Sequence, residues 1–347
     1  MKKKLLKILP QIVIVLVVAA LLVIMAGGNP LRAIKIFFQG TLGNLNGFME
    51  IFVKATPLIF LGLGVSVSFR TGFFNIGAEG QLYMGAVAAT ATVFALPGLS
   101  GAVRIILATL AAFVTGGLWA LIPAMLKRKM NISETVTTIM FNYIAIMIVG
   151  ILVRGPLQDK SGALPQTPFI PDEASLPLLA YPTRLHLGVV LAIASAILLY
   201  ILLTKTTVGY ELKIVGTSPR AAFCMGLPIT RSLIISALLG GGLAGMAGMN
   251  EVLGVQHRLL EGISSGNGYT AVLVALLARN HPIGVVIVSV LLAAVQVGAN
   301  TMQRQMGIPA SIVNLLIGFI VVMVLSQDIV KIYREHKKAK DMEVNQK

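Results

Sequence analysis

Residues 204–231 read TKTTVGYELKIVGTSPRAAFCMGLPITR and form a polar island between two long apolar runs. Ser218 fits the N-cap of a helix, because its hydroxyl can accept a hydrogen bond from a free N–H of the first turn. Pro219 suits the first helical position, where its missing N–H costs nothing, and Gly226 suits a left-handed helix end. These signals predict a helix of about seven residues, ~10 Å long, between Ser218 and Gly226.

A helix this short is only marginally stable by itself in water, so it must pack against something else. The residues leave two alternatives open: the helix docks on the body of this chain, or it docks on a partner protein. The segment carries Lys205, Lys213, Arg220 and Arg231 against a single acid, Glu211. Because Lys and Arg gather on the cytoplasmic side of membrane proteins, the segment is predicted to face the cytoplasm.

The composition of the chain indicates a polytopic membrane protein. Of its 347 residues, 56% are apolar and only 12% are charged, whereas a soluble domain carries about 25% charged residues. The net charge of +15 does not indicate nucleic-acid binding, because the basic residues cluster at the ends of apolar runs. The single cysteine, Cys224, excludes an intrachain disulfide, and the four scattered histidines have no metal-ligand spacing.

The apolar runs predict an all-α protein with about ten membrane spans. Both termini are predicted to be cytoplasmic, with one transmembrane domain over residues 1–330 and a basic cytoplasmic tail over 331–347. Residues 154–185, rich in proline, are predicted to form a long outer loop that either docks an external partner or is disordered. The predicted spans cover about residues 8–26, 57–70, 82–96, 103–126, 132–153, 186–203, 232–249, 263–278, 283–299 and 309–326.

The eighth of these spans is the weakest, because only residues 269–278 are cleanly apolar. Such a stretch is ~15 Å long as a helix, against a hydrocarbon core of ~30 Å. It either starts earlier, near Ile263, or belongs to a re-entrant pair. Ten spans put about two thirds of the 28 basic residues inside, whereas nine spans would place the basic tail outside.

Two glycine-rich patterns are better explained by packing and by loop structure than by catalysis. Residues 240–245, GGGLAG, match a dinucleotide-binding pattern, but no strand precedes them. Gly241 and Gly245 are instead predicted to form a face of small residues for close helix packing. Residues 262–266, GISSG, match a hydrolase pattern but lack its strand–turn–helix context.

Three stretches carry a resemblance to a known family: the segment 204–231, residues 73–81 (FFNIGAEGQ) and residues 131–143 (NISETVTTIMFNY). Together they resemble the permease subunits of ABC importers for simple sugars, nucleosides and branched-chain amino acids. The third stretch is most similar to the nucleoside-type branch. The resemblance covers roughly residues 50–328 and implies a type II-like permease fold.

The resemblance implies a multi-pass protein of the plasma membrane that is not an enzyme and needs no cofactor. It implies three partners: an ATP-binding cassette ATPase that binds the ATP, a second homologous permease or a second copy, and an extracellular substrate-binding lipoprotein. The chain itself has no phosphate-binding G-x-x-x-x-G-K-[ST] loop. The residues implied to couple to the ATPase are Ser218, Pro219, Arg220, Phe223 and Gly226.

Polar residues inside apolar surroundings are the candidates for a transport pathway, because such groups are costly in a membrane. Asn75, Glu79 and Gln81 follow the second span, and Asn142 lies in the middle of the fifth. For Glu79 the alternative is that it caps a helix start at the membrane interface, where an acid suits the positive end of the helix. For Asn142 the alternatives are interhelical hydrogen bonding, which we favour, and contact with polar cargo.

Three functions follow from these observations in descending order. The first is the permease of an ABC importer, with nucleosides as the preferred cargo and simple sugars as the alternative. The second is an ion-coupled secondary transporter, which normally carries ionisable residues near the membrane midplane. The third is a membrane enzyme, for which no paired carboxylates, metal cluster or nucleophile–base set is present.

Overall fold

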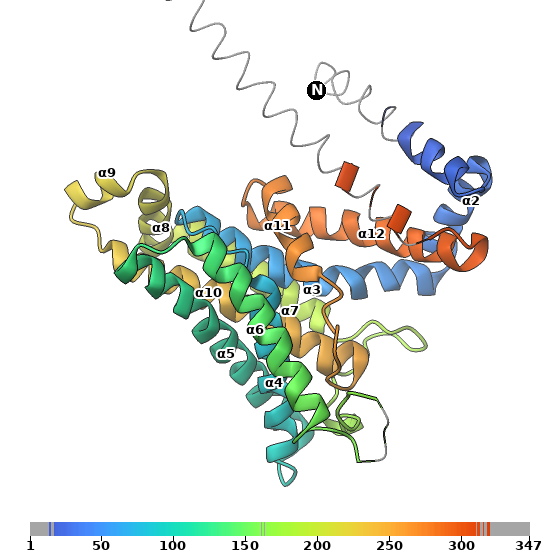
Figure 1. Cartoon of the computed structure of the whole chain (residues 1–347), viewed down its shortest axis with the longest axis horizontal. Coiled ribbons are helices and arrows are strands. Elements are labelled where there is room, and N and C mark those ends of the chain that lie inside the picture. Colours follow the sequence, from blue (N-terminus) through green and yellow to red (C-terminus); the bar gives the residue numbers. More distant parts are fainter. Residues whose placement is uncertain are drawn as a thin grey trace, which may run out of the picture. The chain divides into compact units, whose positions relative to one another are not determined.

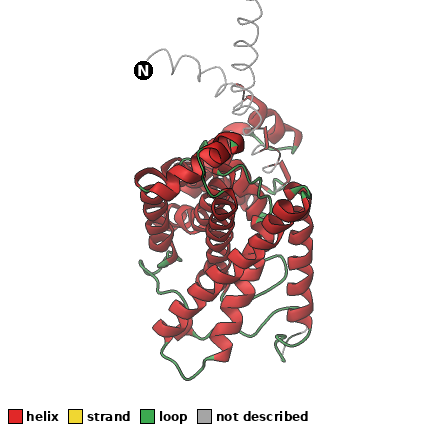
Figure 2. Ribbon diagram, turned by 90° about the vertical axis from the view of Figure 1, so that its left-hand side faces the viewer, coloured by secondary structure: helices red, strands yellow, loops and turns green. Residues whose placement is uncertain are grey.

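The computed structural model describes residues 14, 17–160, 162, 164–309, 311, 312, 315, 318 and 319. Helices joined by loops make up this described part, and no strand occurs in it (Figure 2). The elements, labelled in Figure 1, are α2 (Pro30–Thr41), α3 (Leu45–Arg70), α4 (Ala78–Ala95), α5 (Gly101–Met130), α6 (Glu134–Arg154), η1 (Asp172–Ala174), α7 (Gly188–Lys205), α8 (Thr207–Thr217), α9 (Pro219–Cys224), α10 (Ile229–Asn250), η2 (Glu251–Gln256), α11 (Asn267–Leu277) and α12 (Pro282–Met306).

Six of these helices are long and apolar enough to cross a membrane, or seven if the bent pair Val17–Met25 and Pro30–Thr41 forms one span. The all-helical, multi-pass prediction is therefore confirmed, whereas the count of ten stays a prediction. The tenth predicted span, over 309–326, lies largely outside the described residues, and so do the start of the first span and the tail. The six helices are α3, α5, α6, α7, α10 with η2, and α12.

Two predicted spans are weaker in the structure than the others. Helix α4 starts with the polar residues Glu79 and Gln81, and α11 has 11 residues, a length of ~16 Å. The helical part of the predicted eighth span begins at Asn267 rather than near Ile263, after an irregular stretch. Residues 28–54, between the first two predicted spans, hold α2 and the first turns of α3.

Small residues let the helices of residues 49–291 approach closely, as predicted for the glycine-rich stretch. A side chain at Gly241 would overlap the backbone of Gly116 on α5, and one at Gly245 would overlap Ala112 on the same helix. A side chain at Gly85 on α4 would overlap Gly245. The packing face of Gly241 and Gly245 is thus confirmed, because α10 lies against both α4 and α5.

The outer loop is folded onto the end of α10 and η2, so the alternative of disorder is wrong for its described residues. Thr167 N donates to Leu259 O at 2.9 Å, and Leu259 N donates to Thr167 Oγ1 at 3.0 Å. Leu176 N donates to Leu253 O, within η2, at 2.8 Å. The loop therefore has a defined shape that a partner could recognise.

The chain divides into two compact units, residues 49–291 and residues 1–48 with 292–347. In the smaller unit, α2 packs on the second half of α12. A side chain at Gly298 would overlap the ring of Phe37, and one at Gly40 would lie 2.6 Å from Thr301 Cβ. The site described below lies within the larger unit.

Candidate functional site

The connection between α3 and α4, residues 71–77, is an irregular turn that we call the elbow. Asn75 Nδ2 donates to Gln81 Oε1 at 3.2 Å, and Gln81 Nε2 donates to Asn75 Oδ1 at 3.0 Å. Asn75 Oδ1 also accepts from Gly77 N at 2.9 Å. Both side chains are buried. The amides of Asn75 and Gln81, both from the stretch 73–81, therefore hold the elbow in its shape.

Glu79 is buried at the second position of α4, with 3% of its surface exposed. One of its carboxylate oxygens, Oε2, accepts hydrogen bonds from Ser264 Oγ and Gly268 N, both at 2.8 Å. Gly268 lies in the first turn of α11, so the carboxylate meets the positive end of that helix. The alternative that Glu79 caps a helix start therefore describes its contacts, and the helix that it caps is α11.

Asn142 joins three helices from its fully buried position on α6. Its Oδ1 accepts from Gly80 N at 2.8 Å. Its Nδ2 donates to Ile76 O at 3.0 Å and lies 3.5 Å from the hydroxyl of Tyr269. The interhelical hydrogen bonding favoured for this amide is confirmed, whereas contact with cargo stays a prediction.

We call Glu79, Asn142, Ser264, Gly268 and Tyr269 the polar junction. It forms where α4, α6 and the start of α11 meet, and its chemistry is one carboxylate, one amide, two hydroxyls and a backbone N–H. No group of three or more His, Cys, Asp or Glu that could hold a metal ion occurs among the described residues.

Tyrosine side chains form the accessible part of this region. Tyr269, in the first turn of α11, is 39% exposed, and Tyr143, next to Asn142 on α6, is 53% exposed. Aromatic faces with a hydroxyl can both stack on a flat solute and hydrogen-bond to it.

Ser264, Gly268 and Tyr269 were not singled out by the sequence. Ser264 belongs to the GISSG stretch, whose hydrolase match is false, and the interrupted apolar pattern of residues 263–278 was the available signal. A short helix preceded by glycine and serine is typical of a broken span, and such breaks are tolerated where the backbone lines a cavity or is buried in protein.

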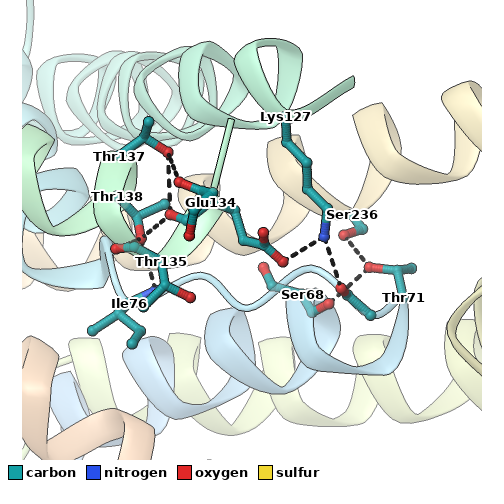
Figure 3. Close-up of polar contacts among 11 residues, drawn as sticks. Ser68, Thr71, Ile76, Lys127, Glu134, Thr135, Thr137, Thr138 and Ser236 are labelled. Atoms are coloured by element: carbon teal, nitrogen blue, oxygen red, sulfur yellow. Dashed lines mark hydrogen bonds and ion pairs between the residues drawn. The ribbon is translucent and has the colours of Figure 1, made fainter. Parts of the chain in front are cut away.

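A second polar cluster holds the start of the elbow (Figure 3). Lys127 Nζ, near the end of α5, donates to Gly72 O at 3.2 Å and forms an ion pair with the Glu134 carboxylate, at the start of α6. The Thr71 and Ser236 hydroxyls share a hydrogen bond of 2.6 Å, which joins the elbow to α10. None of these four side chains was predicted as a site residue.

The coupling segment, residues 204–231, forms the predicted short helix and one that was not predicted. In α9, the Ser218 side chain accepts from Ala221 N at 3.2 Å, Pro219 is the first helical residue, and Gly226 has a φ of 70°. Leu227 N donates to Ala222 O at 2.9 Å, which closes the helix end. Helix α8, which precedes α9, is the one that was not predicted.

Helix α9 presents apolar and basic side chains to its surroundings. Phe223 is 77% exposed and Met225 is 56% exposed, and Arg220 is exposed as well. Ala222 is the buried residue of α9. Of the two alternatives, docking on the body of this chain therefore uses one small side chain and leaves the larger ones free for a partner.

Comparison with known proteins identifies relatives over nearly the whole chain. The family model described as branched-chain amino acid transport system / permease component matches residues 47–325. The guanosine ABC transporter permease protein NupP of Bacillus subtilis is 33% identical, over 92% of this chain and 93% of its own. The nucleoside ABC transporter permease protein NupB of Lactococcus lactis is 30% identical, over 97% and 95%.

A sugar permease is similar to the same degree. The glucose ABC transporter permease protein TsgB13 of Haloferax volcanii is 34% identical, over 88% of this chain and 83% of its own. Among solved structures, PsaBC from Streptococcus pneumoniae in complex with Fab aligns with 84% of this chain and 95% of its own, at a TM-score of 0.44 and 18% identity. That structural likeness is too low to carry an argument.

Proposed function

The chain belongs to the family of branched-chain amino acid transport system permease components, and from this membership we propose that it is the membrane subunit through which an ABC importer moves nucleosides. The observation that carries the proposal is its similarity, over 92% of the chain, to a guanosine permease. Members of this family are multi-pass membrane proteins and transport components without enzymatic activity of their own.

The proposed topology has ten spans with both termini in the cytoplasm. It is supported by the positive-inside distribution of Lys and Arg. The described residues contain six or seven of the candidate spans. In this topology the coupling segment faces the cytoplasm. Residues 154–185 and the end of α10 face outward, where the folded outer loop is available to a substrate-binding lipoprotein.

The proposed energy source is a separate ATP-binding cassette ATPase that docks on α9. Ser218, Pro219 and Gly226 shape this helix, and the exposed side chains of Arg220 and Phe223 supply a charge and an aromatic anchor. Aromatic and Arg side chains are the groups that dominate protein–protein contacts. A second homologous permease or a second copy completes the transporter, and the chain itself binds no ATP and needs no cofactor.

The proposed pathway runs beside the polar junction. Asn75 and Gln81 bind each other, and Glu79 and Asn142 bind the backbone, so these four residues build the wall of the pathway. Cargo contact then comes from Tyr143 and Tyr269, which are accessible. Stacking of an aromatic side chain on a nucleobase contributes about 1–3 kcal/mol per base to binding. Because the tyrosine side chains are neutral, they form no ion pair that would hold the cargo.

Uptake measurements test the cargo. In a strain that lacks this permease, expression of the chain with its ATPase and binding protein should restore uptake of labelled guanosine and other nucleosides, and unlabelled nucleosides should compete. Glucose should neither be taken up nor compete. Restored glucose uptake without nucleoside uptake would favour the sugar alternative, which the similarity to a glucose permease keeps open.

A further inference from the structure

The elbow is held at its first residues by a clasp of two charged side chains. Lys127 and Glu134 come from different helices, α5 and α6, and meet over the backbone of Gly72, whose carbonyl oxygen accepts from Lys127 Nζ at 3.2 Å (Figure 3). Their side chains are 32% and 14% exposed. Removing either partner would leave the other as a partly buried charge without its counterion, which is unfavourable.

The same part of the elbow is tied to the helix that follows α9. Thr71 Oγ1 and Ser236 Oγ lie 2.6 Å apart, both buried, so the elbow and α10 are linked side chain to side chain. Close by, Arg128 Nε donates to Thr230 Oγ1 at 2.9 Å, which ties the end of α5 to the first turn of α10. A shift of α9 and α10 would therefore reach the elbow directly.

The other end of the elbow is part of the polar junction. Ile76 N donates to Thr138 Oγ1 at 3.3 Å, and Ile76 O accepts from Asn142 Nδ2 at 3.0 Å. Two residues beyond the elbow, Glu79 caps α11. The elbow is thus a short, irregular segment. The Lys127–Glu134 ion pair holds its first residues, and its last residues contact the site proposed for cargo.

We propose that Lys127 and Glu134 are positioning residues that make the elbow transmit motion from α9 and α10 to the polar junction. When the Lys127–Glu134 ion pair is formed, it holds the elbow against α5 and α6. A displacement of Ser236 then moves the backbone of the elbow as a whole. When the ion pair is broken, the elbow deforms locally, and the displacement does not reach the polar junction. This inference rests on the proposed function as an ATP-driven permease but not on the identity of the cargo.

Charge reversal tests the clasp in the complete complex of permease, ATPase and binding protein, reconstituted in membranes. Lys127→Glu and Glu134→Lys are made singly and together, and Lys127→Arg is the conservative variant. The control is Lys129→Glu, an exposed cation that points to the opposite side of α5 because two residues turn a helix by about 200°. The readouts are solute transported per ATP hydrolysed and the labelling of a reporter thiol.

The reporter thiol reads the polar junction without any cargo. Because Cys224 is the single cysteine, Cys224→Ser gives a cysteine-free chain, and Ser265→Cys places an exposed thiol next to Ser264. The rate at which a water-soluble maleimide modifies this thiol, with and without a non-hydrolysable ATP analogue, measures whether nucleotide binding reaches the junction.

Each single reversal should lower transport per ATP at least tenfold and abolish the nucleotide effect on labelling, while ATP hydrolysis continues. The double reversal should recover to about two- to fivefold below the native complex, because each swapped charge then faces an unfavourable helix end. Lys127→Arg and Lys129→Glu should behave like the native complex. If a reversal prevents assembly of the complex, Lys127→Gln and Glu134→Gln are measured instead, with the same expected losses.

Native-like coupling in the single reversals or in their neutral replacements overturns the proposal, and so does a double reversal that assembles but recovers nothing. Failure of the cargo assignment has a different signature. In that case the native complex transports no nucleoside, yet nucleotide still changes the labelling of the reporter thiol and the clasp variants still abolish that change.

Discussion

At the scale of single residues, the buried polar groups around the elbow all have hydrogen-bond partners, several of them far away in the sequence. Glu79 caps a helix that lies almost 190 positions further along the chain, and Asn142 binds the backbone of the elbow. A buried carboxylate or amide is stable only with such partners, and losing one costs about 1–3 kcal/mol. The buried polar residues here therefore fix the arrangement of the helices, and this arrangement positions Tyr143 and Tyr269.

Gly80 is required for the contact between α4 and α6. A Cβ there would lie 2.9 Å from Asn142 Cα and 3.0 Å from its Oδ1, closer than real side-chain carbons come. We expect Gly80→Ala to destabilise the protein by about 1–3 kcal/mol, measured as a lower thermal midpoint in detergent. Gly98→Ala is the matched control, because nothing lies within 4 Å of its Cβ position. Equal midpoints for both variants would contradict the packing described here.

His186 predicts a pH dependence of stability. It precedes α7, outside the membrane-spanning helices, and is 1% exposed. Burial, followed by His257 and Arg184, lowers the pKa of His186 to about 4. In the unfolded chain the pKa is about 6.5, so the unfolded state binds the proton first. The contribution of neutral His186 to the free energy of unfolding is therefore fully present above about pH 6.5 and should decrease as the pH falls towards 4.

Thermal midpoints between pH 7 and pH 4.5 test this expectation, and His186→Gln should flatten the curve. An identical slope in the native chain and in His186→Gln would remove His186 as the cause.

At the scale of elements, the irregular pieces are the ones to which we assign proposed functions. The long helices α5, α6 and α10 pack through small residues, whereas the elbow, the stretch before α11 and the coupling segment interrupt the regular pattern. Helix α11 is half a span because residues 257–266 approach the junction without forming an α-helix. Such breaks free backbone groups for hydrogen bonds with other elements, as Gly268 N does with Glu79.

The exposed face of α9 predicts a defect in ATPase binding without a defect in folding. Arg220→Glu and Phe223→Ala should each weaken co-purification of the ATPase at least tenfold and abolish uptake. The thermal midpoint of the permease should stay within a degree or two, because surface changes alter stability by less than ~0.5 kcal/mol. Lys213→Glu, an exposed residue of α8, is the control. Full ATPase binding by both α9 variants would place the docking surface elsewhere.

Gly226 gives a second, purely conformational test of the same element. Its φ of 70° is accessible to glycine but strained for a β-branched side chain, although nothing lies within 4 Å of its Cβ position. Gly226→Val should therefore disturb the end of α9 and uncouple transport while the protein remains inserted in the membrane. Gly226→Asn should be tolerated better, because asparagine adopts the left-handed conformation more readily.

At the scale of the whole molecule, the proposed function is a transport pathway without an energy source of its own. Purified by itself into liposomes, it should not concentrate any solute under a sodium or proton gradient. Addition of the ATPase, the binding protein and ATP should produce concentrative uptake. Accumulation by the permease alone under an ion gradient would instead establish the secondary-transporter alternative.

The sequence by itself determined the class of the molecule, the family and the short helix after Ser218. Each depends on local signals: repeated long apolar runs, basic flanks, and a cap, proline and glycine in consecutive order. The packing face of Gly241 and Gly245 was also readable, because small residues four positions apart lie on one side of a helix.

Only the tertiary structure decided what the polar residues do. Glu79 reads as an acid near a helix start, and nothing nearby in the sequence indicates that its partners are Ser264 and Gly268. Lys127 and Glu134 read as ordinary flanking charges until α5 and α6 bring them together over Gly72. Local signals act over a few residues, whereas a buried polar group takes whichever partner the packing of distant helices brings within about 3 Å.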